Sequence, residues 1–472
     1  MTSLLSTQGA VRPHVTRVAL AAALALGAAT SFAQSAPAPA APSAVTQQQL
    51  LERVDALARE LEQVKAQLQA MKAAQAAPAA APVGNGNGAV ATAGAPATTT
   101  ATSAPGAPAG APPAVAVAPA PAGEPATVIS SYGELNYLNS KGATATGDVA
   151  RFVIGLQHRF DDKTKMASEL EVEHTVVSSS DQGEIEVEQL YVEHRLNDTY
   201  GLRGGLLLMP IGLLNNNHEP TAYYGVERNF VETAIIPSTW REGGVQLFGE
   251  HGNGVSWSAG LSTGFDLSKW DATSEEGRQS PLGSIHQELQ LAKAHDIAVF
   301  GNVDWRGIPG LRLGMSAFSG GASQAQSGFP STSARVTLYD VHAQWTPGPW
   351  DLSALWTQGH ISGAGAFNTT IAGSPTPVPK RIDGWYAQAA YRWQLAGDYT
   401  LAPFARYERF NTGRGFDGLP MGIDPGAYGT EAVRTVGVNF QLNPEVVLKA
   451  DLQRFHLDSS QDRWDLGLGY SF

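Results

Sequence analysis

The densest mixture of charged and aromatic side chains lies between residues 210 and 242. Carboxylate and guanidinium groups gathered in one loop can set the width and the electric field of a water-filled passage. The same groups can also form ion pairs that fix the loop to its surroundings, and we expect that role for part of them. The candidate constriction residues are Glu219, Tyr224, Glu227, Arg228, Glu232, Trp240, Arg241 and Glu242.

A second group of charged residues alternates with apolar residues. In residues 150–156 the even positions are apolar, whereas Arg151 and Gly155 stand at odd positions. Because successive side chains of a strand point to opposite faces, one face would meet water and the other an apolar medium. Arginine on the wet face can bind oxyanions through paired donors, whereas glutamate there repels them, so the predicted field is mixed. The predicted inward-facing wall residues are Arg151, Arg159, Glu169, Glu171, Glu173, Arg203, Arg312, Arg406 and Glu408.

The composition excludes several classes of chemistry. The chain contains no cysteine, which rules out disulfides, thiolate zinc sites, iron–sulfur clusters and a cysteine nucleophile. The formal net charge is −12, from 31 Lys and Arg against 43 Asp and Glu, and this argues against a nucleic-acid partner. His158, His174 and His194 lie near predicted strand ends without the carboxylate pattern of a metal site. We predict no enzyme activity, no metal site and no cofactor.

The first 33 residues have the features of a secretory signal peptide, cleaved after Ala33. Basic residues precede an apolar run from Val18 to Ala29, and small residues follow it. This run of about 12 residues is too short to span a membrane, which takes about 20. Because no later stretch approaches that length, we expect the mature chain to be either soluble outside the cytoplasm or a closed barrel.

Two segments of different composition follow. Residues 45–73 carry apolar residues at a heptad spacing, which predicts a coiled-coil helix that associates with other helices. A single amphipathic helix lying on its own domain is the alternative. Residues 74–127 consist almost entirely of Ala, Pro, Gly, Thr and Val, so we expect a disordered or extended spacer. The spacer is either a tether or a passive insert. The heptad residues are Leu50, Val54, Leu57, Leu61, Val64, Leu68 and Met71.

Residues 128–472 form the third part, which we predict to be all-β, as a sixteen-stranded antiparallel transmembrane barrel. Every second connection between the runs is short and most of the others are long, as in outer-membrane barrels. Runs of about 9 to 12 residues match tilted strands that cross hydrocarbon. Two soluble sandwich domains are the alternative, and they would not explain the alternating loop lengths. The sixteen runs are 129–139, 148–160, 165–177, 184–196, 199–209, 243–250, 255–265, 296–305, 311–319, 334–345, 350–359, 383–395, 400–410, 432–442, 446–455 and 463–472.

The loop string and the last strand carry a resemblance to a known family. The string YYGVERNFVETAIIPSTWREGG at residues 223–244, with GLLLMPIG and NHEP before it, resembles the phosphate-selective porin O and P family. The closing strand ends at Phe472, which resembles the assembly signal of outer-membrane barrels. The resemblance covers residues 129–472 and implies a trimeric, sixteen-stranded outer-membrane pore that passes anions by passive diffusion. The mixed inward charges depart from the basic lining of that family, so we carry over the pore and not the phosphate specificity.

We therefore expect an outer-membrane porin, a passive diffusion channel for small hydrophilic solutes and ions, with anions such as phosphate as the finer hypothesis. The alternative is a structural tether that links the barrel to the periplasm or cell wall through the coiled coil. The expected partners are small ions and solutes, outer-membrane lipid and two further copies in a homotrimer. The coiled coil and spacer are expected in the periplasm.

Overall fold

The computed structural model describes residues 126–178 and 180–472. The predicted signal peptide, the coiled coil and nearly all of the spacer lie outside the described residues. Within residues 126–178 and 180–472, no helix combines the length and the apolar character needed to cross a membrane. The short helices there are η1 (Val231–Ile235), η2 (Leu267–Lys269), α3 (Glu276–Gln279), η3 (Gly283–Ile285), α4 (Gly365–Thr370) and η4 (Ser459–Gln461).

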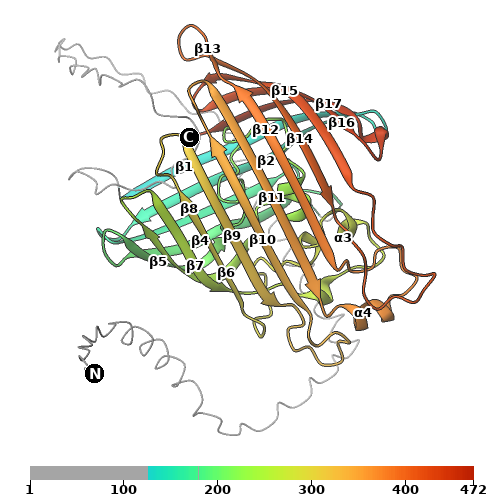
Figure 1. Cartoon of the computed structure of the whole chain (residues 1–472). Helices are drawn as coiled ribbons and strands as arrows, with labels where there is room; N and C mark the ends of the chain where they lie inside the picture. Colours follow the sequence, from blue (N-terminus) through green and yellow to red (C-terminus); the bar gives the residue numbers. More distant parts are fainter. Residues whose placement is uncertain (1–125, 179) are drawn as a thin grey trace, which may run out of the picture. The chain divides into compact units, whose positions relative to one another are not determined.

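The strands form one closed antiparallel barrel (Figure 1). Each strand pairs with its neighbours in the sequence, and β1 pairs with both β2 and β17, which closes the ring. β12 and β13 are interrupted at Arg392 and both pair with β14, so they form one stave and the barrel has the predicted sixteen. The strands are β1 (Thr127–Ser140), β2 (Thr146–Arg159), β3 (Thr164–Glu173), β4 (Glu184–Arg195), β5 (Tyr200–Leu208), β6 (Arg241–Glu250), β7 (Val255–Ser262), β8 (Ala298–Trp305), β9 (Leu311–Gly321), β10 (Arg335–Trp345), β11 (Trp350–Ser362), β12 (Arg381–Tyr391), β13 (Trp393–Gln394), β14 (Thr400–Asn411), β15 (Glu431–Asn443), β16 (Val446–Phe455) and β17 (Arg463–Ser471).

The period-two pattern separates two faces of the barrel. On β2, Phe152, Ile154 and Leu156 are exposed on the outside, whereas Arg151 is 4% exposed on the inside. β16 repeats this arrangement, with Leu448 exposed and Lys449 buried. The outer surface is thus an apolar belt, and charged side chains line much of the inner wall.

Side-chain hydrogen bonds stabilise the short turns at one end of the barrel. Three of the tight connections use an Asp or Asn side chain that accepts hydrogen bonds from backbone N–H groups two and three residues further on, which favours a short turn. These residues are Asp161, Asn197 and Asn443. The long connections 209–240, 263–297, 322–334, 363–380 and 412–430 alternate with the tight ones. Figure 1 shows α3 and α4, which belong to these long connections, at the end of the barrel away from β13.

A hydrophobic core lies inside the barrel, between the long loops and the inner wall. The rings of Trp240, Phe265 and Phe318 pack with centroids 4.7 to 5.3 Å apart. Wall residues such as Leu338 on β10 and Ile382 on β12 belong to the same buried cluster. The loops therefore fill part of the lumen and leave the remainder to polar side chains.

Candidate functional site

The connection 209–240, which we call the constriction loop, crosses the lumen. It leaves the wall after β5, yet the backbone N–H of Phe230 donates to Glu408 on β14 at 2.7 Å. β14 is the thirteenth stave and β5 the fifth, so they lie 13 − 5 = 8 places apart in a ring of sixteen, on opposite sides. Further bonds reach Asp340 on β10 at 3.1 Å and Asp451 on β16 at 2.7 Å. The loop is thus held across the barrel and around its wall.

Glu232 organises the loop internally. Its Oε1 accepts the N–H groups of Leu213 and Leu214 at 2.5 and 2.8 Å, and its Oε2 accepts Asn229 Nδ2 at 3.0 Å and the hydroxyl of Tyr386 at 2.9 Å. Both oxygens of this buried carboxylate are therefore used, as a buried charge requires. Glu232 ties the loop to β12.

The predicted wall pair Arg406 and Glu408 acts as an anchor. Arg406 Nε lies 2.9 Å from Glu408 Oε1, and Arg406 Nη1 donates to the carbonyl of Tyr224 at 3.0 Å. Both wall side chains are buried. They bind the loop backbone through charged groups, and such hydrogen bonds are stronger than neutral ones.

A second buried network lies on β1 and β2. Arg151 Nε donates to Glu134 at 2.8 Å, and its Nη2 donates to the carbonyl of His218 at 2.5 Å. The hydroxyl of Tyr223 donates to Glu134 at 2.6 Å, and Lys449 Nζ lies 3.6 Å from the Tyr223 ring centroid. Arg151 thus anchors the loop on the wall that adjoins the closure of the barrel.

Two of the other three predicted wall arginines are also paired. Arg203 Nε lies 2.7 Å from Glu193, and Arg312 bonds both oxygens of Asp304 at 2.8 and 3.0 Å. Arg159, at the end of β2, has no ion pair among residues 126–178 and 180–472. An oxyanion on Arg151, Arg203, Arg312 or Arg406 would have to compete with a carboxylate already in place.

Arg228 differs from the wall arginines. Its Nη1 donates to Ser238 Oγ at 2.5 Å and to Thr239 Oγ1 at 2.9 Å, within the loop itself. In the described part of the chain it has no ion pair, and it is half-buried. Arg228 therefore adds to the constriction loop a positive charge that has no direct carboxylate partner among the described residues.

Facing the loop, β3 and β4 present an acidic surface. Glu171 stands opposite Glu186 in the ladder, and Glu173 opposite Glu184. Like charges directly opposite one another are destabilising, so this surface gains from water and cations. The acidic face consists of Glu169, Glu171, Glu173, Glu184, Glu186 and Glu188. Only the β3 members were predicted as wall residues, although the alternation of Glu184, Glu186 and Glu188 on β4 follows the same pattern.

A bulge sets the last member of this face. Glu169 pairs with Gln189 and Leu170 with Val187, so Glu188 is the extra residue on β4. A bulge re-aims side chains, and here Gln189 Nε2 donates to Glu169 while the neighbouring Glu188 also turns inward and is fully buried.

Three predicted constriction residues have other roles. Trp240 is fully buried in the core, and Arg241 and Glu242 are the first residues of β6. Arg241 lies 2.5 Å from Glu186 and 2.9 Å from Glu288, and Glu242 accepts the hydroxyl of Thr263 at 2.5 Å. The loop ends earlier than expected because Trp240 closes the core.

The remaining predicted residues stay near the loop–wall boundary. The hydroxyl of Tyr224 donates to Asp351 at 3.3 Å, and Glu227 pairs with Arg463. Glu219 is half-buried, and its Oε2 has no hydrogen-bond partner in the described residues. The backbone N–H of Phe472 donates to Ser131 at 2.9 Å, which joins the last residue to β1.

The loop 263–297 adds a buried titratable group. Burial lowers the pKa of His286 to about 4, against the opposing effect of Glu288, whose Oε1 lies 3.4 Å from His286 Nδ1. Within residues 126–178 and 180–472, His158 and His194 bond to Thr127 and Thr164 and His174 bonds to Asp148, so these three histidines form no joint site there.

One catalytic sequence pattern occurs and lacks its context. Residues 260–264 read Gly-Leu-Ser-Thr-Gly. A nucleophile elbow needs a sharp strand-to-helix turn that exposes the serine hydroxyl. Ser262 instead ends the antiparallel strand β7, is 2% exposed, and its Oγ has no hydrogen-bond partner among the described residues. This serine has no base to activate it.

Comparisons with known proteins place the fold. No family model matches the chain. An uncharacterized protein of Aquifex aeolicus (strain VF5) is 28% identical over 348 residues, which are 71% of this chain and 77% of that protein. The structure of Salmonella typhi OmpF in complex with daunomycin has a TM-score of 0.51 at 11% identity and covers 73% of this chain and 97% of OmpF. An anion-selective porin from Comamonas acidovorans has a TM-score of 0.44 at 12% identity, covering 73% of this chain and 100% of that one. The similarity to OmpF supports a porin-type barrel fold.

Proposed function

We propose that the protein is an outer-membrane porin, a passive diffusion channel for small hydrophilic solutes and ions. The observation that carries the proposal is the constriction loop, which crosses from β5 to Glu408 on the opposite wall and is bonded there. A loop held in the lumen narrows a barrel of this size to a defined passage. The apolar outer belt and the charged inner wall support the same function.

The proposal includes a preference for cations over phosphate. The four buried or half-buried wall arginines Arg151, Arg203, Arg312 and Arg406 are each paired with a carboxylate. Among the described residues, the six glutamates of the acidic face form ion pairs only with Arg241 and His218. The net field at this wall is therefore negative, which favours cations.

The oligomer and the cellular position are part of the proposal. The resemblance of the loop string implies a homotrimer in the outer membrane. The tight turns would then face the periplasm, because short turns lie on that side of outer-membrane barrels. The signal peptide and the periplasmic coiled coil remain predictions from residues 1–73.

A reversal-potential measurement tests the proposal. The full-length mature protein is refolded, inserted in a planar bilayer and studied in a gradient of potassium chloride. We expect discrete channels whose reversal potential lies toward the potassium equilibrium potential. Added phosphate should block little of the current. A chloride-side potential with phosphate block would contradict the selectivity, and folded protein that forms no channels would contradict the function.

A further inference from the structure

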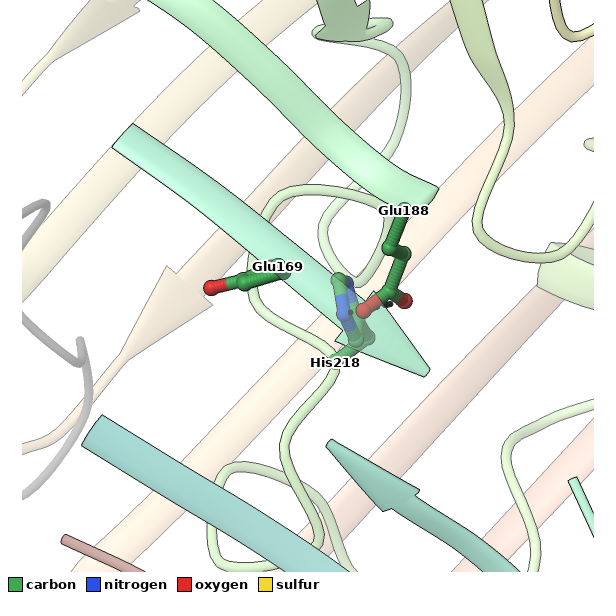
Figure 2. A group of neighbouring side chains, drawn as sticks. All are labelled: Glu169, Glu188 and His218. Carbon is green, nitrogen blue, oxygen red and sulfur yellow. Dashed lines mark ion pairs between the residues drawn. The ribbon is translucent and has the colours of Figure 1, made fainter. Parts of the chain in front are cut away.

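Two glutamates and a histidine meet where the constriction loop touches the acidic face. His218 comes from the loop, Glu188 from the bulge of β4 and Glu169 from β3 (Figure 2). One ligand atom of each residue lies within 4.8 Å of the others. The three residues are 19 and 30 positions apart in the sequence, so only the folded loop brings them together.

The hydrogen bonds of His218 define its ring. Its Nδ1 lies 2.8 Å from the backbone carbonyl oxygen of Asn215. A carbonyl oxygen only accepts, so Nδ1 carries a proton, and Nε2 is the nitrogen that can bind a metal in place of a proton. That Nε2 lies 2.9 Å from Glu188 Oε1 and 2.8 Å from the hydroxyl of Tyr132. A ring held by a carbonyl at one nitrogen, with the other aimed at carboxylates, is the usual orientation of a metal-binding histidine.

Among the described residues, the buried Glu188 forms an ion pair only with His218, which is charged only when it is protonated. Glu188 is 0% exposed, and its Oε2 accepts the hydroxyl of Tyr132 at 2.5 Å. Its Oε1 has no hydrogen-bond partner among the described residues. The nearby Arg151 uses its Nε on Glu134 and its Nη2 on the carbonyl of His218. A buried carboxylate without compensation is costly, so a cation at this point would be stabilising.

The charges at this point favour a divalent ion over a proton. A second proton on His218 would balance one carboxylate, but Glu169 brings another negative charge to the same place. A divalent cation with two carboxylates and a neutral imidazole is electrically balanced. Imidazole and carboxylate oxygens are ligands of zinc and similar transition metals.

We propose that Glu169, Glu188 and His218 bind a divalent transition-metal cation of the Zn²⁺ type. Ligands at about 2.2 Å from one ion in tetrahedral geometry lie about 3.6 Å apart. The 4.8 Å spread therefore has to shrink by about 1.2 Å on binding, and the half-buried Glu169 is the ligand that would have to move. The ion would fasten the first part of the constriction loop to β3 and β4. The inference does not depend on the proposed channel function.

The test is calorimetric titration of the full-length protein in detergent with Zn²⁺ after treatment with a chelator. We expect one saturable site per chain. Glu169→Gln and His218→Gln are each expected to weaken Zn²⁺ binding by at least about tenfold, a typical loss when a metal site is disrupted. The matched control is His295→Gln, because His295 is 67% exposed and pairs only with Asp296. This control should bind Zn²⁺ like the unaltered protein.

A spectroscopic readout separates coordination from folding. His218 also anchors the loop, so His218→Gln can disturb the fold. The one hydrogen bond of the Glu169 side chain among the described residues is to Gln189, and Glu169→Gln keeps the shape of the side chain. Co²⁺ in place of Zn²⁺ should give visible absorption bands that Glu169→Gln alters in a protein with unchanged circular dichroism. The absence of saturable Zn²⁺ binding, or equal binding by Glu169→Gln, would overturn the proposal and identify His218 and Glu188 as a simple ion pair. Both readouts use protein in detergent, so a failure of conductance would leave them unaffected.

Discussion

Glu408 accepts the backbone N–H of Phe230 at 2.7 Å, although the loop that carries Phe230 leaves the wall on the opposite side of the barrel. The same carboxylate holds Arg406 at 2.9 Å, and Arg406 holds the carbonyl of Tyr224. One buried ion pair thus makes two contacts with the loop backbone. The width of the passage depends on whether this pair is intact.

We expect Glu408→Ala to release the far part of the constriction loop and to raise the single-channel conductance. The buried Arg406 would lose its partner, which lowers the free energy of unfolding by about 3–5 kcal/mol. Planar-bilayer recordings and denaturant unfolding measure the two effects. The matched control is Glu250→Ala, whose carboxylate is 57% exposed and lies 3.7 Å from Arg195. Equal conductance in both variants would show that the loop is held without Glu408.

Arg228→Ala should increase the cation preference of the channel. In the described part of the chain its guanidinium bonds only to Ser238 and Thr239, so the substitution removes a positive charge from the loop without breaking an ion pair. The reversal potential in a potassium chloride gradient should move further to the potassium side. The control is Arg454→Ala, which removes the charge of an exposed arginine on β16 that pairs with Asp462. An unchanged potential would reduce Arg228 to a packing residue.

The loop 263–297 should lose local stability as the pH falls from about 6.5 to about 4. Burial holds the pKa of His286 at about 4, so the unfolded loop binds a proton in this range before the folded loop does. The loss is at most about 3 kcal/mol. Hydrogen exchange at pH 7 and pH 4.5 measures it. The loop 363–380 is an internal control because it contains no His, Asp or Glu, and equal changes in both loops would rule out His286 as the cause.

A charge on the outer belt should prevent stable insertion. Ile154 is 44% exposed in the middle of β2, so Ile154→Arg should cost about 2–4 kcal/mol if this face meets hydrocarbon. Folding into lipid vesicles, followed with increasing urea, measures the cost. Leu291→Arg is the control, because Leu291 is fully exposed in a loop. Equal stability of the two variants would place the belt outside the membrane.

Deletion of residues 34–125, which leaves β1 complete, should leave the single-channel conductance unchanged. Among the described residues, the hydrogen bonds that hold the constriction loop across the lumen end on wall residues such as Glu408 and Asp451. Bilayer recordings of the shortened and the complete protein provide the comparison. Loss of channels in a shortened protein that still folds would show that the coiled coil and spacer are needed for channel activity.

The strands were predictable because their information is local. The alternation of apolar and polar residues and the Asx turns, as at Asn197 and Asn443, each depend on a few adjacent residues. Together they were sufficient to predict sixteen staves. The ion pairs of the inner wall were harder to predict. The sequence places Arg312 on the inward face, but it does not show that Asp304 pairs with it.

The errors in the candidate site came from long-range packing. Trp240 is buried by Phe318, which lies on a strand three staves further along the wall, so the sequence suggested a lining residue where the structure has a core residue. His218 was not selected because its partners come from β3 and from a bulge in β4. A period of two cannot show that bulge.

The bonds of the constriction loop also constrain the order of biogenesis. The hydroxyls of Thr221 and Ser471 lie 2.6 Å apart, and Tyr223 bonds to Glu134. The loop is encoded in the middle of the chain, yet its contacts require the first strand and the last one to be in place together. The loop can therefore reach its final position only after the ring of strands has closed. A barrel arrested just before that step would be a wider and less selective pore.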